Sequence, residues 1–337
     1  METILLTGGM GFIGSHTCVE LLKQGYAVVL VDNLVNSDRS VLGRIRKISG
    51  QDVPFYEVDV CDRYKLAAIF QKHPIDAVIH FAGLKAVGES KEKPLAYYRN
   101  NLNATLTLLE CMQQAEITRL VFSSSATVYG AAGDHPLTES DPLSCNNPYG
   151  RTKLMSEQII SDYAETVPNF SALLLRYFNP VGAHESGQLG ENPNGIPQNL
   201  MPFLNQVAVG IRPKFSVFGG DYQTPDGTAI RDYIHITDLA RGHISALRYS
   251  KTHTGTDAIN LGTGHGVSVL EMIHAYREAN NVTLPYEVTG RRAGDVAVCY
   301  ANPKKAIELL DWRAELGLLD MCRSAYRWQQ NITTMSP

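Results

Sequence analysis

Short apolar runs alternate with longer helical stretches through the first half of the chain. The apolar runs predict strands at residues 4–7, 27–32, 54–58, 77–81, 119–123 and 171–176. The stretches between them predict helices at residues 12–24, 65–72, 94–115 and 148–167. The strands lack strict alternation of apolar and polar side chains, as burial on both sheet faces requires. The order predicts repeated βαβ units and an α/β fold with a doubly wound parallel sheet.

The composition of the sequence and the length of its predicted elements change after about residue 179. Residues 184–202 are rich in Gly, Pro and Asn, and the later elements are shorter and separated by polar turns. We therefore expect two domains. A nucleotide-binding domain is predicted at residues 1–178, and a smaller domain that carries substrate contacts in its loops is predicted at residues 179–337.

Composition narrows the classes of function. The 337 residues are 44% hydrophobic, enough for a core, and their net charge is −4 without a long block of like charges. We therefore expect no nucleic-acid partner. No apolar run approaches the length of a membrane span and no leader precedes the first strand, so we expect no membrane contact. The six cysteines lack C-x-x-C or metal-ligand spacing, which predicts free thiols, a cytoplasmic location and no metal site.

A glycine-rich turn follows the first predicted strand and opens the first helix. Gly8, Gly11 and Gly14 leave room for backbone amides and a helix N-terminus to meet a pyrophosphate. Their spacing is G-x-x-G-x-x-G, whereas the usual dinucleotide fingerprint is G-x-G-x-x-G, so a merely structural turn stays an alternative. Asp32 ends the second strand, where a carboxylate binds a ribose hydroxyl and repels a 2′-phosphate, which favours NAD over NADP. The alternative for Asp32 is a turn residue; Asp59, at the end of the third strand, is a weaker candidate for the adenine side.

Tyr149 and Lys153 are four residues apart in a predicted helix, so they share one face. A free phenol has a pKa near ~10 and is a poor base at neutral pH. A neighbouring ammonium, together with the positive charge of a nicotinamide, would lower that pKa and make Tyr149 a usable proton acceptor. Without other evidence, such a pair usually lies on the solvent-exposed face of a helix and has no catalytic role.

Three serines, Ser123 to Ser125, follow an apolar strand at the edge where open α/β sheets bind ligands. One hydroxyl is well placed to bond the substrate oxygen that Tyr149 deprotonates, although a serine run is more often a turn or a cap. The order of glycine turn, acidic strand end, serine and Tyr-x-x-x-Lys is far more specific than any single feature. Together these features predict oxidation of an alcohol.

At this point the chain resembles the extended short-chain dehydrogenase/reductase family and, within it, the UDP-galactose 4-epimerases. The likeness covers nearly the whole chain. It rests on seven segments: TGGMGFIGSH at 7–16, DNL at 32–34, HFAGLKAVGES at 80–90, SSSATVYG at 123–130, RYFNP at 176–180, NLMP at 199–202 and RDYIH at 231–235. The segments at 82–90 and 176–180 are specific to the epimerases and not merely to the fold.

The resemblance implies a transient oxidation of a UDP-sugar at C4 with NAD as a retained cofactor, and a homodimer formed through a four-helix contact. The implied catalytic residues are Ser125, Tyr149 and Lys153. The implied cofactor contacts are Gly8, Gly11, Phe12, Ile13, Gly14, Asp32, Asn33, Asn36, Ser37, Asp59, Val60, Phe81, Ala82, Gly83, Lys85, Asn100, Ser123, Tyr149, Lys153, Tyr177 and Phe178. The implied substrate contacts are Ser125, Tyr149, Phe178, Asn179, Asn199, Leu200, Val217, Phe218, Arg231, Arg292, Asp295 and Cys299.

The resemblance places Cys299 at the wall of the sugar pocket. Epimerases limited to unmodified hexoses tend to carry tyrosine there, whereas those that accept N-acetylated sugars carry a smaller residue. Our hypothesis is that the enzyme interconverts UDP-GlcNAc and UDP-GalNAc as well as UDP-glucose and UDP-galactose. Two alternatives stay open: Cys299 is an inert small hydrophobic residue, or a one-residue slip puts the Tyr300 ring into the same space.

Three other functions are compatible with the same fold. A 4,6-dehydratase needs a further acid/base pair, but its family carries Thr-Asp-Glu where this chain has Ser125-Ala126-Thr127. A decarboxylase acting on UDP-glucuronate is harder to exclude from one sequence. A non-catalytic NAD-sensing regulator could dispense with Tyr149 and Lys153, which are present here.

Overall fold

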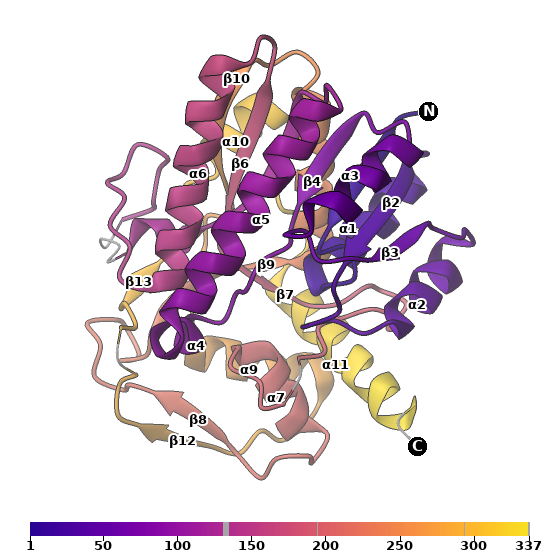
Figure 1. The fold of residues 1–337 in the computed structure, drawn as a ribbon. Helices are drawn as coiled ribbons and strands as arrows, with labels where there is room; N and C mark the ends of the chain where they lie inside the picture. The colour runs from indigo at the N-terminus through magenta and orange to yellow at the C-terminus, as the bar shows by residue number, and fades with distance from the viewer. Residues whose placement is uncertain (131–134, 194, 293, 336–337) are drawn as a thin grey trace.

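The computed structural model describes residues 1–130, 135–193, 195–292 and 294–335. Its centre is a seven-stranded sheet in the order β10-β6-β5-β4-β1-β2-β3, in which every neighbouring pair is parallel (Figure 1). This arrangement confirms the predicted doubly wound sheet. The strands are β1 Thr3–Thr7, β2 Ala27–Asp32, β3 Phe55–Glu57, β4 Ala77–His80, β5 Arg119–Ser125, β6 Ser171–Tyr177 and β10 Gly255–Leu261.

Helices cover both faces of this sheet because successive strand side chains point to opposite sides. In β1, Ile4 and Leu6 pack with α1 (Phe12–Lys23) and α8 (Ile236–Tyr249) on one face, whereas Leu5 packs with α3 (Arg63–Lys72) and α5 (Pro94–Gln114) on the other. All three side chains are fully buried, as a parallel sheet between two helical layers requires. On the face of Ile4 and Leu6, α2 Ser40–Ser49 and α10 Lys304–Leu310 lie with α1 and α8. On the face of Leu5, α6 Pro148–Thr166 lies with α3 and α5.

A second, smaller group of helices and strands lies beyond the carboxyl ends of the main strands, in the lower part of Figure 1. Its core is a separate apolar cluster in which α7, α9 and α11 pack around β8 and β9. β9 pairs with β7, β11 and β13, and β8 pairs with β12. The elements are β7 Asn179–Val181, α7 Leu200–Ala208, β8 Phe215–Phe218, β9 Ile230–His235, β11 Gly266–Ser268, α9 Val269–Asn280, β12 Tyr286–Thr289, β13 Val298–Cys299 and α11 Leu318–Met335.

A strand from late in the chain also belongs to the main sheet. β10 pairs with β6 along its whole length, and α8 packs against α1. Both elements lie in the segment assigned to the second domain, so the chain returns to the first layer after its first excursion. The division at residue 178 stays a prediction.

In the first half of the chain, two α-helices were not predicted, for physical reasons. α2 buries only Ile45 fully and contains Gly43, so its apolar stripe is thin. α4, Val87–Glu92, is a six-residue helix, too short to show a clear period. Within the described ranges, no helix is long and apolar enough to cross a membrane.

Candidate active site

The glycine turn is built by close backbone contacts. Gly8 has φ +68°, and a Cβ there would lie 2.7 Å from the backbone nitrogen of Ala82. A Cβ on Gly14 would lie 2.4 Å from the carbonyl oxygen of Gly8. Gly11 is the N-cap of α1 and supplies no side-chain cap, which leaves the helix start suited to an anion. Glycines therefore let the turn pack between the end of β1 and the loop after β4.

This packing makes a sharp prediction about cofactor retention. In Gly14→Ala the new methyl group meets backbone that cannot move aside. We therefore expect loss of bound NAD and a free energy of unfolding that is lower by about 2 kcal/mol. Gly43→Ala is the matched control because, among the described residues outside its helix, no atom lies within 4 Å of the new Cβ. Alanine there should stabilise α2 by about 0.5–1 kcal/mol. Thermal unfolding and the absorbance of released NAD measure both effects; equal behaviour of the two variants would contradict the packing argument.

Asp32 lies beside the glycine turn at the end of β2. Its Oδ2 accepts a hydrogen bond from the backbone N–H of Met10 at 3.0 Å, and its Oδ1 accepts from Leu34 N–H and Ser37 Oγ at 2.9 and 2.8 Å. Asn33 Nδ2 donates to Asp59 Oδ2 at 3.1 Å. A carboxylate has about four acceptor positions, so Asp32 retains capacity for a ribose hydroxyl. The glycine cradle and this acid cluster together fit the adenosine diphosphate part of NAD.

The loop after β4 closes another side of the same space. Asn101, which the sequence analysis missed, accepts from Leu84 N–H at 2.8 Å and donates to Thr152 Oγ1 at 2.9 Å. Asn100, a predicted cofactor contact, donates to the Asn101 side chain at 3.0 Å. Asn101 therefore joins the β4 loop to α6. The only sequence signal was its position next to Asn100.

Glu191 connects residues from the two predicted sites. Its Oε1 accepts hydrogen bonds from Lys85 Nζ at 3.1 Å and from Asn199 Nδ2 at 3.0 Å. The Glu191 side chain is only 9% exposed. Lys85 is a predicted cofactor contact and Asn199 a predicted substrate contact, so the two sites are neighbours. The sequence analysis did not find Glu191 because its segment has no regular period.

The start of α6 places Tyr149 and Lys153. Asn147 caps this helix, accepting from Gly150 N–H at 2.8 Å, and Pro148 occupies the first turn. Lys153 is buried and donates to the carbonyl oxygen of Ser123 at 2.5 Å, with its ammonium 4.9 Å from the Phe122 ring centroid. Burial lowers the pKa of Lys153 to about 8, while the negative charge of Glu157 opposes that shift.

Tyr149 has a raised pKa in this arrangement. Burial raises the pKa of its phenol to about 12, and a hydrogen bond from Ser125 acts in the opposite direction. The sequence analysis predicted that Lys153 together with a bound nicotinamide lowers this pKa. Among the protein groups alone, burial outweighs the Ser125 contact, and the Lys153 ammonium donates to the Ser123 carbonyl. The lowering in the cofactor-bound site stays a prediction.

The three serines have different environments. Ser124 is fully buried and donates to Glu157, whereas the Ser123 side chain lies next to Tyr177, whose pKa burial raises. Only Ser125 faces Tyr149, and its Oγ also accepts from Thr127 at 3.0 Å. The structure therefore separates the predicted catalytic serine from its two neighbours.

The other predicted cofactor residues surround these groups. Gly83 is next to the Asn101 side chain, and Tyr177 Oη lies 3.3 Å from His243 Nε2. The side chain of Val60 is buried in the core, so only its backbone can contact a ligand. Phe12, Ile13, Phe81 and Ala82 are partly buried around the glycine turn and the β4 end, and Asn36 is exposed beyond β2.

The predicted substrate residues form two groups. Arg292 pairs with Asp295 at 3.0 Å and stacks on Phe218, 5.8 Å from its ring centroid. Arg231 lies in β9 directly beside Cys299 of β13. Asn179 is exposed at the start of β7, and Leu200 begins α7. The side chain of Val217 is fully buried, so it contributes to a ligand site only through its backbone.

Cys299 and Tyr300 point in different directions. Cys299 packs against the cluster that contains Phe178, Tyr129 and Val128, next to the end of β5. The Tyr300 ring instead lies beside Gly266, where a Cβ would be 3.7 Å away. The two side chains therefore have different neighbours, and the position of Cys299 at the wall of the sugar pocket stays a prediction. Among the described residues, no group of three or more His, Cys, Asp or Glu side chains is arranged to hold a metal.

Comparisons with known proteins give a consistent likeness. A protein-family profile described as GDP-mannose 4,6 dehydratase matches residues 5–325. The chain is 54% identical over 328 residues to a UDP-glucose 4-epimerase of Bacillus subtilis, covering 97% of each chain. It is 52% identical to a UDP-glucose 4-epimerase of Mus musculus, covering 98% of this chain and 97% of the mouse protein.

Solved structures are similar over the same extent. A UDP-glucose-4-epimerase from Stenotrophomonas maltophila, with bound NAD and formylated UDP-arabinopyranose, has a TM-score of 0.98, 48% identity and full coverage of both chains. One from Bifidobacterium longum, in complex with NAD+ and UDP, has a TM-score of 0.94, 51% identity and 98% coverage of each chain. A UDP-Glc/GlcNAc 4-epimerase from Campylobacter jejuni has a TM-score of 0.85 and 36% identity, covering 98% of this chain and 100% of the other.

Proposed function

Because the chain belongs to the UDP-glucose 4-epimerases of the extended short-chain dehydrogenase/reductase family, we propose that it interconverts UDP-glucose and UDP-galactose by inverting C4. The enzyme is an NAD-dependent isomerase that works through a transient 4-keto sugar. The observation that carries this proposal is the meeting of Tyr149, Ser125 and Lys153 at the carboxyl end of β5. This is the sheet edge where an open α/β fold binds its ligands.

NAD is the cofactor that the site fits. The glycine turn would hold its pyrophosphate, and Asp32, with Asn33 and Ser37 beside it, would hold the adenosine ribose. Lys85 and Asn100 would line the space from the opposite side. When bound, NAD supplies the acceptor that takes a hydride from C4 of the sugar and later returns it.

Tyr149 is the proposed acid and base. It would take the proton from the sugar 4-hydroxyl during oxidation and return it to the same oxygen during reduction, so no net proton is consumed. Ser125 would hydrogen-bond that oxygen and steady it between the two steps. A phenol whose pKa is about 12 needs further stabilisation of its anion at neutral pH, and the Lys153 ammonium is the cation one helical turn away.

Inversion requires the sugar to present both faces while the nucleotide stays bound. Arg231 and Arg292 would hold the diphosphate, because guanidinium groups match paired phosphate oxygens. Phe218 is 44% exposed and would offer an apolar surface to the nucleotide. The 4-keto sugar would then rotate about its diphosphate linkage within a fixed site.

The proposed substrate range includes the N-acetylated sugars. Cys299 is partly buried next to Phe178, and a thiol there leaves more space than a phenol. The ring of Tyr300 lies on the other side, beside Gly266. The similar Campylobacter protein carries both UDP-Glc and UDP-GlcNAc in its name, which supports the same range here.

The proposed assembly is a homodimer through α5 and α6, two helices that pack side by side. Leu95, Leu106 and Met155 on these helices are 78%, 44% and 43% exposed, and a second copy packed on this helix pair would cover them. Molar mass from light scattering tests the assembly. The proposed location is the cytoplasm, supported by six free cysteines, and cell fractionation tests it.

The epimerase proposal is tested by incubating the purified protein with UDP-galactose, without added NAD, and resolving the nucleotide sugars. We expect UDP-glucose to form until the two sugars reach equilibrium. A dehydratase would instead give a stable 4-keto-6-deoxy sugar, although the segment Ser125-Ala126-Thr127 lacks the carboxylate for that elimination. No product at all would favour the NAD-sensing regulator.

A further inference from the structure

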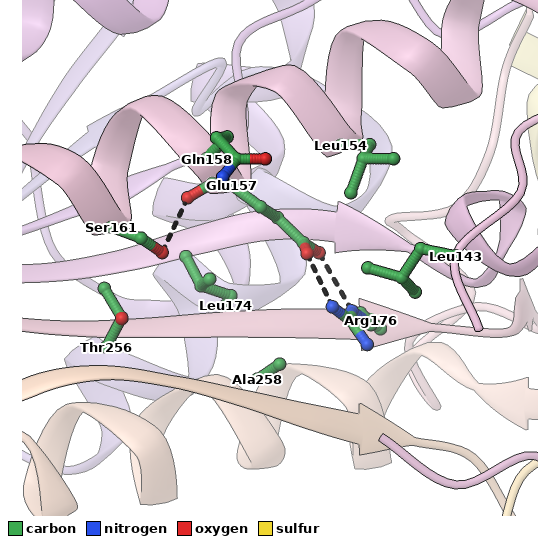
Figure 2. Close-up of a pocket in the computed structure, with 9 residues that line it drawn as sticks. All are labelled: Leu143, Leu154, Glu157, Gln158, Ser161, Leu174, Arg176, Thr256 and Ala258. Atoms are coloured by element: carbon green, nitrogen blue, oxygen red, sulfur yellow. Dashed lines mark hydrogen bonds and ion pairs between the residues drawn. The ribbon is translucent and has the colours of Figure 1, made fainter. Parts of the chain in front are cut away.

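A buried ion pair lies behind the catalytic strand. Arg176 of β6 contacts Glu157 of α6 through two parallel hydrogen bonds, Nη2 to Oε2 at 2.6 Å and Nε to Oε1 at 3.0 Å. Both side chains are only 5% exposed. Figure 2 shows the pair from a cavity of about 250 Å³ between α6 and the strands β6 and β10. Neither residue is assigned a role in the proposed mechanism.

The pair is tied to the end of β5 through one face of α6. Residues 149, 153 and 157 follow at i, i+4 and i+8, so they lie in one row along the helix. Tyr149 meets the side chain of Ser125, Lys153 donates to the Ser123 carbonyl, and Glu157 accepts from Ser124 Oγ. Three successive residues of β5 are therefore each held by one member of the row.

Arg176 holds the same segment from the neighbouring strand. It is the register partner of Ser124 in the parallel pairing of β5 with β6. Its Nη1 donates to Tyr129 Oη at 3.1 Å, and its guanidinium lies 5.1 Å from the Tyr129 ring centroid. Tyr129 ends the short helical turn that follows Ser125 and donates to Asn260 of β10 at 2.7 Å. The guanidinium thus fixes the chain on both sides of the catalytic serine.

We propose that Glu157 and Arg176 are positioning residues for the epimerase reaction, which hold the end of β5 so that Ser125 and Lys153 meet Tyr149 in a fixed geometry. This proposal rests on the proposed function. A buried ion pair contributes little net stability compared with apolar side chains of similar volume, so packing alone gives weak reason to place one here. Fixed geometry at the reacting groups is a specific reason, because small displacements there reduce rate strongly.

Glu157 also affects the charge of Lys153. Glu157 on α6 and His80 on β4 interact electrostatically with Lys153, and Tyr149 lies one helical turn away from it on α6. Burial lowers the pKa of His80 to about 3, so this imidazole is uncharged at neutral pH, whereas the negative charge of Glu157 acts to raise the pKa of Lys153. Removal of that negative charge lowers the pKa of Lys153 further, and the ammonium is then lost at a lower pH.

The test uses three variants of the full chain, each confirmed to be folded by circular dichroism. In Glu157→Gln we expect kcat for UDP-galactose to fall about 100-fold with KM within about threefold, as loss of a transition-state contact does. The alkaline limb of its kcat–pH profile should move to lower pH by at least about half a unit. In Ser124→Ala, which leaves the ion pair intact, we expect kcat to fall about tenfold with the alkaline limb unmoved.

Arg119→Ala is the matched control. Arg119 begins β5, at the end of the strand opposite to Ser125, and its Nη1 forms an ion pair with Glu2 Oε1 at 2.7 Å. It should lower the melting temperature and leave both kcat and the pH profile unchanged. The proposal is overturned if folded Glu157→Gln and Ser124→Ala keep the kcat of this control, or if Glu157→Gln loses activity with an unmoved alkaline limb. The wild-type protein is measured in parallel. An inactive wild type would contradict the proposed epimerase function, whereas an active wild type with equally active variants would contradict the positioning role.

Chemical rescue gives an independent readout. The cavity in Figure 2 is roomy enough to admit a guanidinium ion beside Glu157 once the arginine side chain is removed. In Arg176→Ala we expect millimolar guanidinium, well below denaturing concentration, to raise kcat at least about fivefold, and sodium at the same ionic strength to have no effect. Folded Arg176→Ala with wild-type kcat would contradict the proposal.

Discussion

Tyr149→Phe should lower kcat for UDP-galactose by about 10³-fold, the usual range for loss of a general acid–base group. The phenylalanine ring keeps the shape of the residue, so KM and bound NAD should change little. Ser125 and Lys153 remain, but neither can replace the phenol: a serine hydroxyl is too weak an acid to ionise, and the lysine is held by the Ser123 carbonyl. Steady-state kinetics and the NAD content of the purified variant measure both parts of the prediction.

Tyr163→Phe on the same helix is the control. The Tyr163 hydroxyl is buried without a hydrogen-bond partner among the described residues, so its removal should be neutral or slightly stabilising. Its kcat should equal that of the wild type. If Tyr149→Phe retained more than about a tenth of wild-type kcat, the phenol would not be the base and another proton acceptor would have to be sought.

Cys299→Tyr should reduce turnover of UDP-GalNAc by about 100-fold or more and leave UDP-galactose within about threefold of wild type. The added ring fills space next to Phe178, and overfilling a packed site commonly costs about 1–3 kcal/mol, with more for a ligand group that must share the volume. The 2-hydroxyl of UDP-galactose fits beside the ring, whereas the 2-acetamido group of UDP-GalNAc does not. Ratios of kcat/KM for the two substrates measure the selectivity.

Cys299→Ala separates the size of the residue from its chemistry. Alanine keeps the space open, so both substrates should still turn over. Burial raises the pKa of the Cys299 thiol to about 11, so the group is a neutral thiol at physiological pH and its loss removes no charge. Equal loss of both substrates in Cys299→Tyr, or no change in either, would show that position 299 does not control substrate size.

The parts of the fold that follow from local pattern were predictable from the sequence. The bounds of β2 agree with prediction at both ends, and α1 and α5 agree to within one residue. Each of these elements has strong local signals: an unbroken apolar run, a glycine-rich start or a proline in the first turn. The fold class is confirmed for the same reason.

Features that depend on distant parts of the chain were not predictable. β10 joins the main sheet beside β6, and no local signal distinguishes it from a strand of the second, smaller group. Asn101 and Glu191 act by joining separate elements, which a pattern along one helix or strand does not reveal. The rise in the Tyr149 pKa that burial causes was not predicted, because the extent of burial around a phenol is a property of the folded site.

The catalytic assignment shows the same division. The spacing of Tyr149 and Lys153 identified the pair, because i and i+4 positions share a helix face whatever surrounds them. The choice of Ser125 from three successive serines came from the resemblance, and the structure supplies the physical reason: Ser124 is occupied by Glu157 and Ser123 lies beside Tyr177.

The central claim is that C4 is oxidised and reduced within one site, and an isotope experiment tests it most directly. UDP-galactose carrying deuterium at C4 is incubated with the purified enzyme in ordinary water without added NAD, and the UDP-glucose formed is examined by mass spectrometry and NMR. The account predicts that deuterium stays at C4 of the product. Loss of deuterium to water would contradict it, since the C4 hydrogen would then leave as a proton and Tyr149 would act on carbon instead of oxygen.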